Sequence, residues 1–295
     1  MNVRELLAKV RKIEITTKRI VDDLTGGAYR SAFKGRGIEF TDVREYVPGD
    51  DVRDIDWNVT ARADAPYVKK YAEEREMTVI LAVDVSRSCA LGSGMTAKRE
   101  RMAETAALLA LSAVRNHDKV GLYLFSERCE LFLPPRSGKQ HTLRVIREML
   151  ACEPEKKGTA IVPALQSLSL SLKKRAVIFL ISDFAFPADY LHPLKFLSRK
   201  HDVVLLRVTD PMEHTMPVLP DLELSDAESG ETLTFPGGFH NCAVFGLAAK
   251  YLAEQTEELA RQAKTELIDL STSEDNIAKT LMGFFRRRVR RGKSL

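Results

Sequence analysis

The sequence of 295 residues lacks the features that mark several large classes of protein. No apolar run approaches the ~20 residues that a membrane-spanning helix needs, and the longest runs, such as Val177–Ile181, have the length of strands. The N-terminal segment MNVRELLAKVRK contains no apolar stretch of the kind found in secretory signals. We therefore expect a cytoplasmic protein without an integral membrane segment.

Cysteine is scarce, and its four positions are widely spaced without a C-x-x-C pair, so the sequence indicates neither a zinc site nor a disulfide framework. The sequence also lacks the G-x-x-x-x-G-K-[ST] loop of many ATPases and the G-x-S-x-G turn of many serine hydrolases. The six histidines are scattered without the spacing of metal ligands. These absences argue against an enzyme, and we expect no catalytic residue and no organic cofactor.

The positive charge of the chain is concentrated near its C-terminus. The formal net charge is +4, and six arginines and lysines lie between Arg286 and Lys293, so the rest of the chain has a small excess of acidic residues. Such a tail could bind nucleic acid or an anionic membrane surface, but a solvated chain end has the same composition. Because no nucleic-acid motif accompanies the tail, direct binding through it is an alternative rather than the main hypothesis.

Hydrophobic patterns divide the chain near residue 76. Residues 2–24 have apolar side chains at helical spacing, and residues 28–76 are rich in Gly, Asp and Arg, which predicts a helix followed by small strands and loops. From Met77 onward, apolar strands alternate with helices. The prediction is an N-terminal domain, residues 1–76, and an α/β domain, residues 77–295. In the second domain we expect strands at 78–83, 120–125, 176–181, 203–208 and 266–270, helices at 96–115, 142–150, 162–173, 188–199, 244–264 and 277–289, and an edge hairpin within 212–240.

Several of the expected strands are apolar along their whole length, as in VILAV and AVIFLI. Strands of this kind suit a parallel sheet that helices cover on both faces, because strands with one wet face alternate polar and apolar residues. The sequence therefore predicts an α/β fold with a doubly wound, mostly parallel sheet and a small β-rich N-terminal subdomain.

Polar residues follow the first of these strands, where open α/β sheets bind ligands. The run Asp84-Val85-Ser86-Arg87-Ser88 places one carboxylate and two hydroxyls on alternate positions of a loop, and hard cations such as Mg²⁺ prefer oxygen ligands. By itself this run is more often a solvated loop with a helix cap than a metal site. Two further segments fall on the same edge of the predicted sheet, because Gly158-Thr159 precedes a helix and Asp183 follows the strand at 176–181.

In motif and in order, these segments resemble the metal-ion-dependent adhesion site of von Willebrand factor A (vWA) domains. The resemblance implies that Ser86 and Ser88 bind Mg²⁺ or Mn²⁺ directly and that Thr159 does so directly or through water. It also implies that Asp84 and Asp183 hold the inner waters or the ion. In that family an acidic residue of a protein partner fills the open coordination position. The resemblance thus implies a protein that binds its partners through a divalent cation.

A second resemblance covers residues 35–76 and continues into the following strand. The segment GRGIEFTDVREYVPGDDVRDIDWNVTARADAPYVKKYAEERE, followed after Met77 by TVILAVDVSRS, is similar to the bacterial family of unknown function numbered 58 (DUF58), whose members are associated with MoxR-type AAA+ ATPases. The family often has Met where this chain has Cys89, at a position that provides no ligand. The resemblance implies an adaptor or co-chaperone for such an ATPase in the maturation of protein complexes.

A metal-dependent hydrolase that uses Asp84 and Asp183 is a further alternative. The sequence indicates no His or Lys at this site that would serve as a general base, and serines bound to a cation are poor nucleophiles. Binding therefore remains the main hypothesis.

The N-terminal block also contains a cluster of opposite charges. This cluster could bind a cation, cap turns, contact a partner or form a network of ion pairs, and we favour the network because mixed charges at close spacing neutralise one another. Trp57 is expected to be its apolar anchor. The charged residues are Asp50, Asp51, Asp54, Asp56, Arg53 and Arg62.

Overall fold

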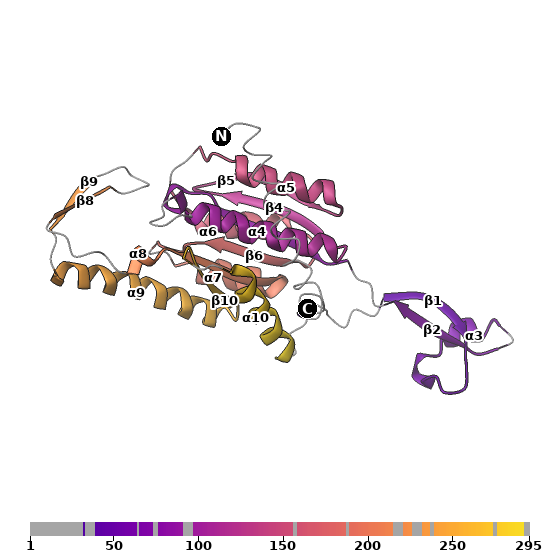
Figure 1. Ribbon diagram of the computed structural model, residues 1–295. Coiled ribbons are helices and arrows are strands. Elements are labelled where there is room, and N and C mark those ends of the chain that lie inside the picture. The colour runs from indigo at the N-terminus through magenta and orange to yellow at the C-terminus, as the bar shows by residue number, and fades with distance from the viewer. Residues whose placement is uncertain are drawn as a thin grey trace.

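Most of the described residues form one α/β unit around a six-stranded sheet (Figure 1). The computed structural model describes residues 32, 39–63, 65–72, 76–90, 97–155, 158–186, 189–214, 221–225, 232–236, 239–273 and 276–291. The helix expected over residues 2–24 lies outside these ranges. No helix within them is long and apolar enough to cross a membrane.

The central sheet has the strand order β10-β7-β6-β3-β4-β5. All neighbouring pairs are parallel except β4 and β5, which are antiparallel. From β3 the chain adds β4 and β5 on one side and then β6, β7 and β10 on the other, so β3 and β6 flank the point where the strand order reverses. The strands are β3 (Thr78–Asp84), β4 (Lys119–Phe125), β5 (Cys129–Arg136), β6 (Val177–Ser182), β7 (Asp202–Thr209) and β10 (Glu266–Ser271).

Helices pack on both faces of this sheet and divide the core into two halves. Successive side chains of a strand point to opposite faces, so Val79 and Leu81 of β3 pack with α4, α5 and α10, whereas Ile80 and Ala82 pack with α6, α7 and the end of α9. Full burial of an aliphatic side chain contributes about 1.5–3 kcal/mol. The helices are α4 (Lys98–Arg115), α5 (Lys139–Ala151), α6 (Ile161–Ser171), α7 (Leu191–Lys200), α9 (Phe239–Gln262) and α10 (Ile277–Arg290).

The predicted fold class is confirmed: an α/β fold with a doubly wound, mostly parallel sheet and a small β-rich N-terminal part. The strand β5 was not predicted. It contains the consecutive residues Pro134 and Pro135, which a strand tolerates here because β5 is at the edge of the sheet. The expectation of an edge hairpin within 212–240 was wrong in one respect, since β8 (Asp221–Ser225) and β9 (Thr232–Pro236) pair with each other in a separate sheet.

The N-terminal block contains a second small antiparallel sheet. The strand β1 (Glu39–Glu45) pairs with β2 (Tyr67–Ala72), and the two are joined through the 3₁₀ helix η1 (Val52–Asp54) and the one-turn helix α3 (Trp57–Thr60). Figure 1 shows this hairpin to the side of the central sheet.

The charged cluster in this block serves mainly to cap turns. Asp51 accepts a hydrogen bond from the backbone of η1, and Asp56 caps α3. Arg44 and Asp50 form an ion pair with 2.6 Å between nitrogen and oxygen. This pair contributes little to the stability of the fold, because the arginine is well exposed. The expectation that Trp57 anchors a charged network was wrong, since Trp57 is 66% exposed.

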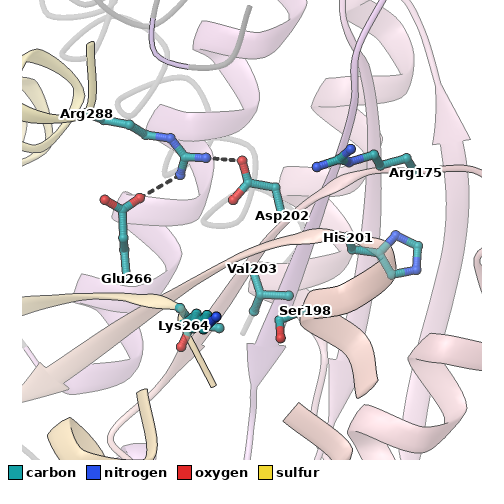
Figure 2. A pocket seen from close by; sticks show the side chains of 9 residues that line it. Arg175, Ser198, His201, Asp202, Val203, Lys264, Glu266 and Arg288 are labelled. Carbon is teal, nitrogen blue, oxygen red and sulfur yellow. Dashed lines mark hydrogen bonds and ion pairs between the residues drawn. The ribbon is translucent and has the colours of Figure 1, made fainter. Parts of the chain in front are cut away.

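Helix α10 is tied to the sheet by Arg288, a residue of the basic tail that is buried in the fold. Its guanidinium donates to Asp202 at the start of β7 and to Glu266 at the start of β10, over 2.9 Å in the second case (Figure 2). It also donates to the carbonyl of Ala32 over 3.1 Å. Two carboxylates and one carbonyl oxygen therefore compensate the charge of the buried guanidinium. The tail is therefore partly a structural element.

Replacing Arg288 tests this role. We expect Arg288→Ala to lower the free energy of unfolding by about 3–5 kcal/mol, because it leaves two carboxylates without their cation. Arg290→Ala, which changes an exposed arginine of the same helix, should alter it by less than about 0.5 kcal/mol. Urea unfolding of both variants measures the difference, and equal effects would show that Arg288 does not anchor the helix.

Candidate metal site

The candidate site lies at the carboxyl edge of the central sheet, between the two strands that flank the reversal of strand order. Asp84 is the last residue of β3, and Asp183 directly follows β6. The two strands are hydrogen-bonded neighbours, with Val83 opposite Ile181, so the two aspartates emerge side by side. The structure therefore brings together residues that are far apart in the sequence.

Asp84 is almost fully buried and is held in place by hydrogen bonds. Its Oδ1 accepts the backbone N–H of Ser86 over 2.9 Å, and its Oδ2 accepts the hydroxyl of Ser182 over 2.7 Å. Burial, together with the negative charge of Asp183, raises the pKa of Asp84 to about 6 even though these hydrogen bonds lower it. The carboxylate is thus oriented but poorly neutralised.

The two serines of the motif provide hydroxyls next to Asp84. The Oγ atoms of Ser86 and Ser88 lie 3.1 Å apart, with Ser86 buried and Ser88 half-buried at the start of the 3₁₀ helix η2 (Arg87–Ala90). Cys89 was expected to provide no ligand, yet its sulfur, Asp84 and Asp183 offer atoms that all lie within 4.8 Å of one another. Burial and the two aspartates raise the pKa of the Cys89 thiol well above its ordinary value, so the sulfur is neutral and a weak ligand.

Asp183 is buried as well, and its two oxygens have different partners. Oδ1 accepts a hydrogen bond from the backbone N–H of Ala185 over 3.2 Å, and Oδ2 accepts one from the ammonium of Lys98 over 2.7 Å. The next residue, Phe184, has a φ of 52°, in the left-handed region that costs a non-glycine residue on the order of 1 kcal/mol. Phe184 is buried, and its ring stacks on Tyr190 with centroids 6.2 Å apart, which helps to hold this turn.

Lys98, the first residue of α4, is a component of the site that the sequence analysis missed. Its ammonium is buried and also contacts Glu213 in the short helix α8 (Pro211–His214). Burial alone would lower the pKa of Lys98, but the carboxylates of Asp183 and Glu213 raise it above its ordinary value. The site thus contains a lysine that the sequence analysis did not place there. Because the amine stays protonated, it is unsuited to act as a general base.

Thr159 lies at the same edge of the sheet, near the end of β4. The backbone N–H of Ala160 donates to the carbonyl of Ser126 over 3.0 Å, directly after β4, and β4 is the neighbour of β3. The N–H of Gly158 donates to Glu127 over 3.1 Å. The structure thus places Thr159 on the loop next to the one that holds Ser86 and Ser88.

The residues present fit a divalent cation. Asp84, Ser86 and Ser88 offer the hard oxygen donors that Mg²⁺ prefers. The ammonium of Lys98 contacts two carboxylates, those of Asp183 and Glu213, and the carboxylate of Asp84 lies beside that of Asp183. Negative charge is therefore in excess among the described residues of the site. Burial and, after it, the charge of Asp183 raise the pKa of Asp84, and a bound cation would stabilise the charged form of this carboxylate.

A sequence signal for Lys98 existed. Lys98, Met102 and Thr105 are spaced at i, i+4 and i+7, and all three are buried, so the lysine falls on the stripe of α4 that faces the core. Glu213 and Ser182 have no comparable signal, since their roles arise only from contacts with residues about one hundred positions away.

Comparisons with known proteins agree with this architecture. The model of the family described as "Protein of unknown function DUF58" matches residues 42–242. An uncharacterized protein of Mycobacterium bovis is 32% identical over 234 residues, which cover 78% of this chain and 74% of the relative. The crystal structure of the conserved hypothetical protein BatB from Bacteroides thetaiotaomicron shares the fold, with a TM-score of 0.50 and 18% identity over 72% of this chain and 99% of that one. A von Willebrand factor type A protein from Catenulispora acidiphila aligns with a TM-score of 0.39 and 10% identity, covering 76% of this chain and 44% of that one.

The pKa of Asp84 predicts how the stability of the metal-free protein depends on pH. Since the folded state raises this pKa to about 6, the stabilisation from the bound proton is complete below the ordinary pKa and is lost as the pH rises through about 6. With chelator at pH ~8, Asp84→Asn should therefore be more stable than the wild type by about 2–3 kcal/mol. At pH ~4 the difference should largely disappear.

Urea unfolding at the two pH values checks this expectation. The matched control is Asp269→Asn, which removes a carboxylate in β10 that is 56% exposed. This variant should not be more stable than the wild type at the higher pH. An Asp84→Asn variant less stable than the wild type at the higher pH would mean that Lys98 already neutralises the whole carboxylate cluster.

Proposed function

Since the chain belongs to the DUF58 family, whose function is unknown, we propose that it is a non-catalytic, vWA-like binding protein with a metal-ion-dependent adhesion site. It holds Mg²⁺ or Mn²⁺ at the carboxyl edge of its sheet and recognises an acidic residue of a protein partner through that ion. The observation that carries this proposal is the pair of buried, incompletely neutralised carboxylates, Asp84 and Asp183, beside two serine hydroxyls.

Each residue of the site has a defined task in this proposal. Ser86 and Ser88 provide neutral oxygen ligands, and Thr159 adds a third hydroxyl directly or through water. Asp84 and Asp183 provide the negative charge that retains the ion. The bound ion supplies a positive charge with a position open to a carboxylate. Because hydrogen bonds from Ser86 and Ser182 fix the carboxylate of Asp84, this side chain needs little reorganisation to bind the ion.

The partner that we propose is a MoxR-type AAA+ ATPase, for which the chain acts as an adaptor or co-chaperone in the maturation of protein complexes. Support comes from the resemblance of residues 35–76 to proteins associated with such ATPases. The chain has no phosphate-binding loop, so the partner would supply ATP hydrolysis.

The alternatives receive no comparable support. A hydrolase needs a general base, and the amine of Lys98 is protonated and bound to two carboxylates. Binding of nucleic acid or membrane through the basic tail would have to do without Arg288, which is buried in ion pairs.

Affinity capture from a lysate of the source cell tests the proposal. The bait is the wild-type chain, Asp84→Asn or Ser86→Ala, each with Mg²⁺ and with chelator, and Asp269→Asn is the matched control. We expect the AAA+ ATPase to be recovered only by the wild type and the control in Mg²⁺, because both site variants weaken the hold on the ion.

Two results would contradict the proposal. Recovery of the ATPase by all baits with and without chelator would show that the contact does not involve the ion. Capture that survives chelator but falls steeply with salt would instead favour electrostatic binding through the basic tail.

A further inference from the structure

Asp183 has two roles that exclude each other. It is a candidate ligand of the divalent cation, and its Oδ2 accepts the ammonium of Lys98 over 2.7 Å. Both side chains are nearly inaccessible to solvent, with 1% and 2% of their surface exposed. An ammonium at this position already supplies Asp183 with positive charge.

Repulsion between like charges is strong in a buried site. A divalent cation at Asp183 would lie a few ångströms from the ammonium of Lys98, where little water screens the two charges. The ion therefore has to weaken or replace the contact between Lys98 and Asp183. A buried ammonium left without any partner would in turn be strongly unfavourable.

Glu213 offers the ammonium a second partner. Its Oε1 already contacts Lys98, while its Oε2 accepts the backbone N–H of Asp210 over 3.0 Å. Asp210 is fixed by the hydroxyl of Thr272 over 2.7 Å, and the carbonyl of Thr272 accepts Arg101 of α4 over 2.8 Å. Glu213 is thus held by a chain of contacts that returns to the helix carrying Lys98.

We propose that Lys98 is an internal competitor of the divalent cation for Asp183, and that Glu213 is the carboxylate that retains Lys98 when the cation binds. This inference rests on the proposed metal-binding function and adds the residues that set its affinity. Lys98 stabilises the site in the absence of the ion and lowers the affinity of the site for the ion. Glu213 limits this loss of affinity, because it remains an ion-pair partner for the ammonium when the ion displaces the ammonium from Asp183.

Calorimetric titration of Mg²⁺ into the full chain tests both halves of the proposal. We expect Lys98→Met, which keeps the length of the side chain without its charge, to bind Mg²⁺ at least about tenfold more tightly than the wild type. Glu213→Gln should bind it several-fold more weakly. Lys119→Met, which breaks an exposed ion pair with Glu76 at the opposite edge of the sheet, is the matched control and should bind as the wild type does.

The double variant, with both Lys98→Met and Glu213→Gln, tests whether Glu213 acts by holding Lys98 or by attracting the ion through its own negative charge. If Glu213 acts by holding Lys98, the effect of Glu213→Gln should be at least about threefold smaller in the Lys98→Met background than in the wild type. An effect of equal size in both backgrounds would overturn the role of Glu213. Loss of the free Mn²⁺ signal in electron paramagnetic resonance gives a second measure of binding, and circular dichroism confirms that each variant is folded.

The remaining outcomes distinguish this inference from the function on which it rests. Wild type and Lys98→Met with equal affinity would overturn the competition and leave the metal site intact. No binding by any variant would overturn both. Binding by Lys98→Met alone would support the competition and would show that the wild-type chain does not function through a bound ion.

Discussion

The burial of two like charges, Asp84 and Asp183, is the constraint on which the site depends. The reversal of strand order imposes this proximity, because β3 and β6 are parallel neighbours whose chains leave the sheet at the same edge. Away from water, two adjacent carboxylates are unfavourable unless positive charge or hydrogen bonds compensate them. The surroundings of the pair provide both, through Ser182, the backbone of the serine loop and the ammonium of Lys98.

The negative charges of the two aspartates are compensated to different degrees, and a carboxylate whose charge is incompletely compensated is suited to bind a cation. Within the described part of the chain, Asp183 has a salt bridge, whereas Asp84 accepts hydrogen bonds from neutral donors and has a raised pKa. The site lowers the stability of the fold, and burial of the apolar core on both faces of the sheet offsets this loss. A fold optimised for stability alone would have neutralised or removed the second carboxylate, and local violations of this kind are expected at functional sites.

The sequence predicted the fold and the polar loop, but it did not predict the buried ammonium of Lys98 in the site. Fully apolar strands alternating with helices predicted the parallel sheet, and the spacing of Asp84, Ser86 and Ser88 identified the loop at its edge. The antiparallel strand β5 was not predicted, and its two consecutive prolines are compatible with a strand only because it lies at the edge of the sheet. Trp57 was misjudged because a large apolar residue usually indicates burial, and it is exposed here. Glu213 could not have been found, since its partner Lys98 is 115 positions away in the sequence.

The central claim is that the carboxylate pair holds a divalent cation in the folded protein. Calorimetric unfolding of the wild-type chain in increasing Mg²⁺, against the same protein in chelator, tests it most directly, since a ligand that binds only the folded state raises the melting temperature with its concentration. The account predicts a melting temperature that rises steadily with Mg²⁺. A melting temperature that is the same in chelator and throughout the Mg²⁺ series would contradict it.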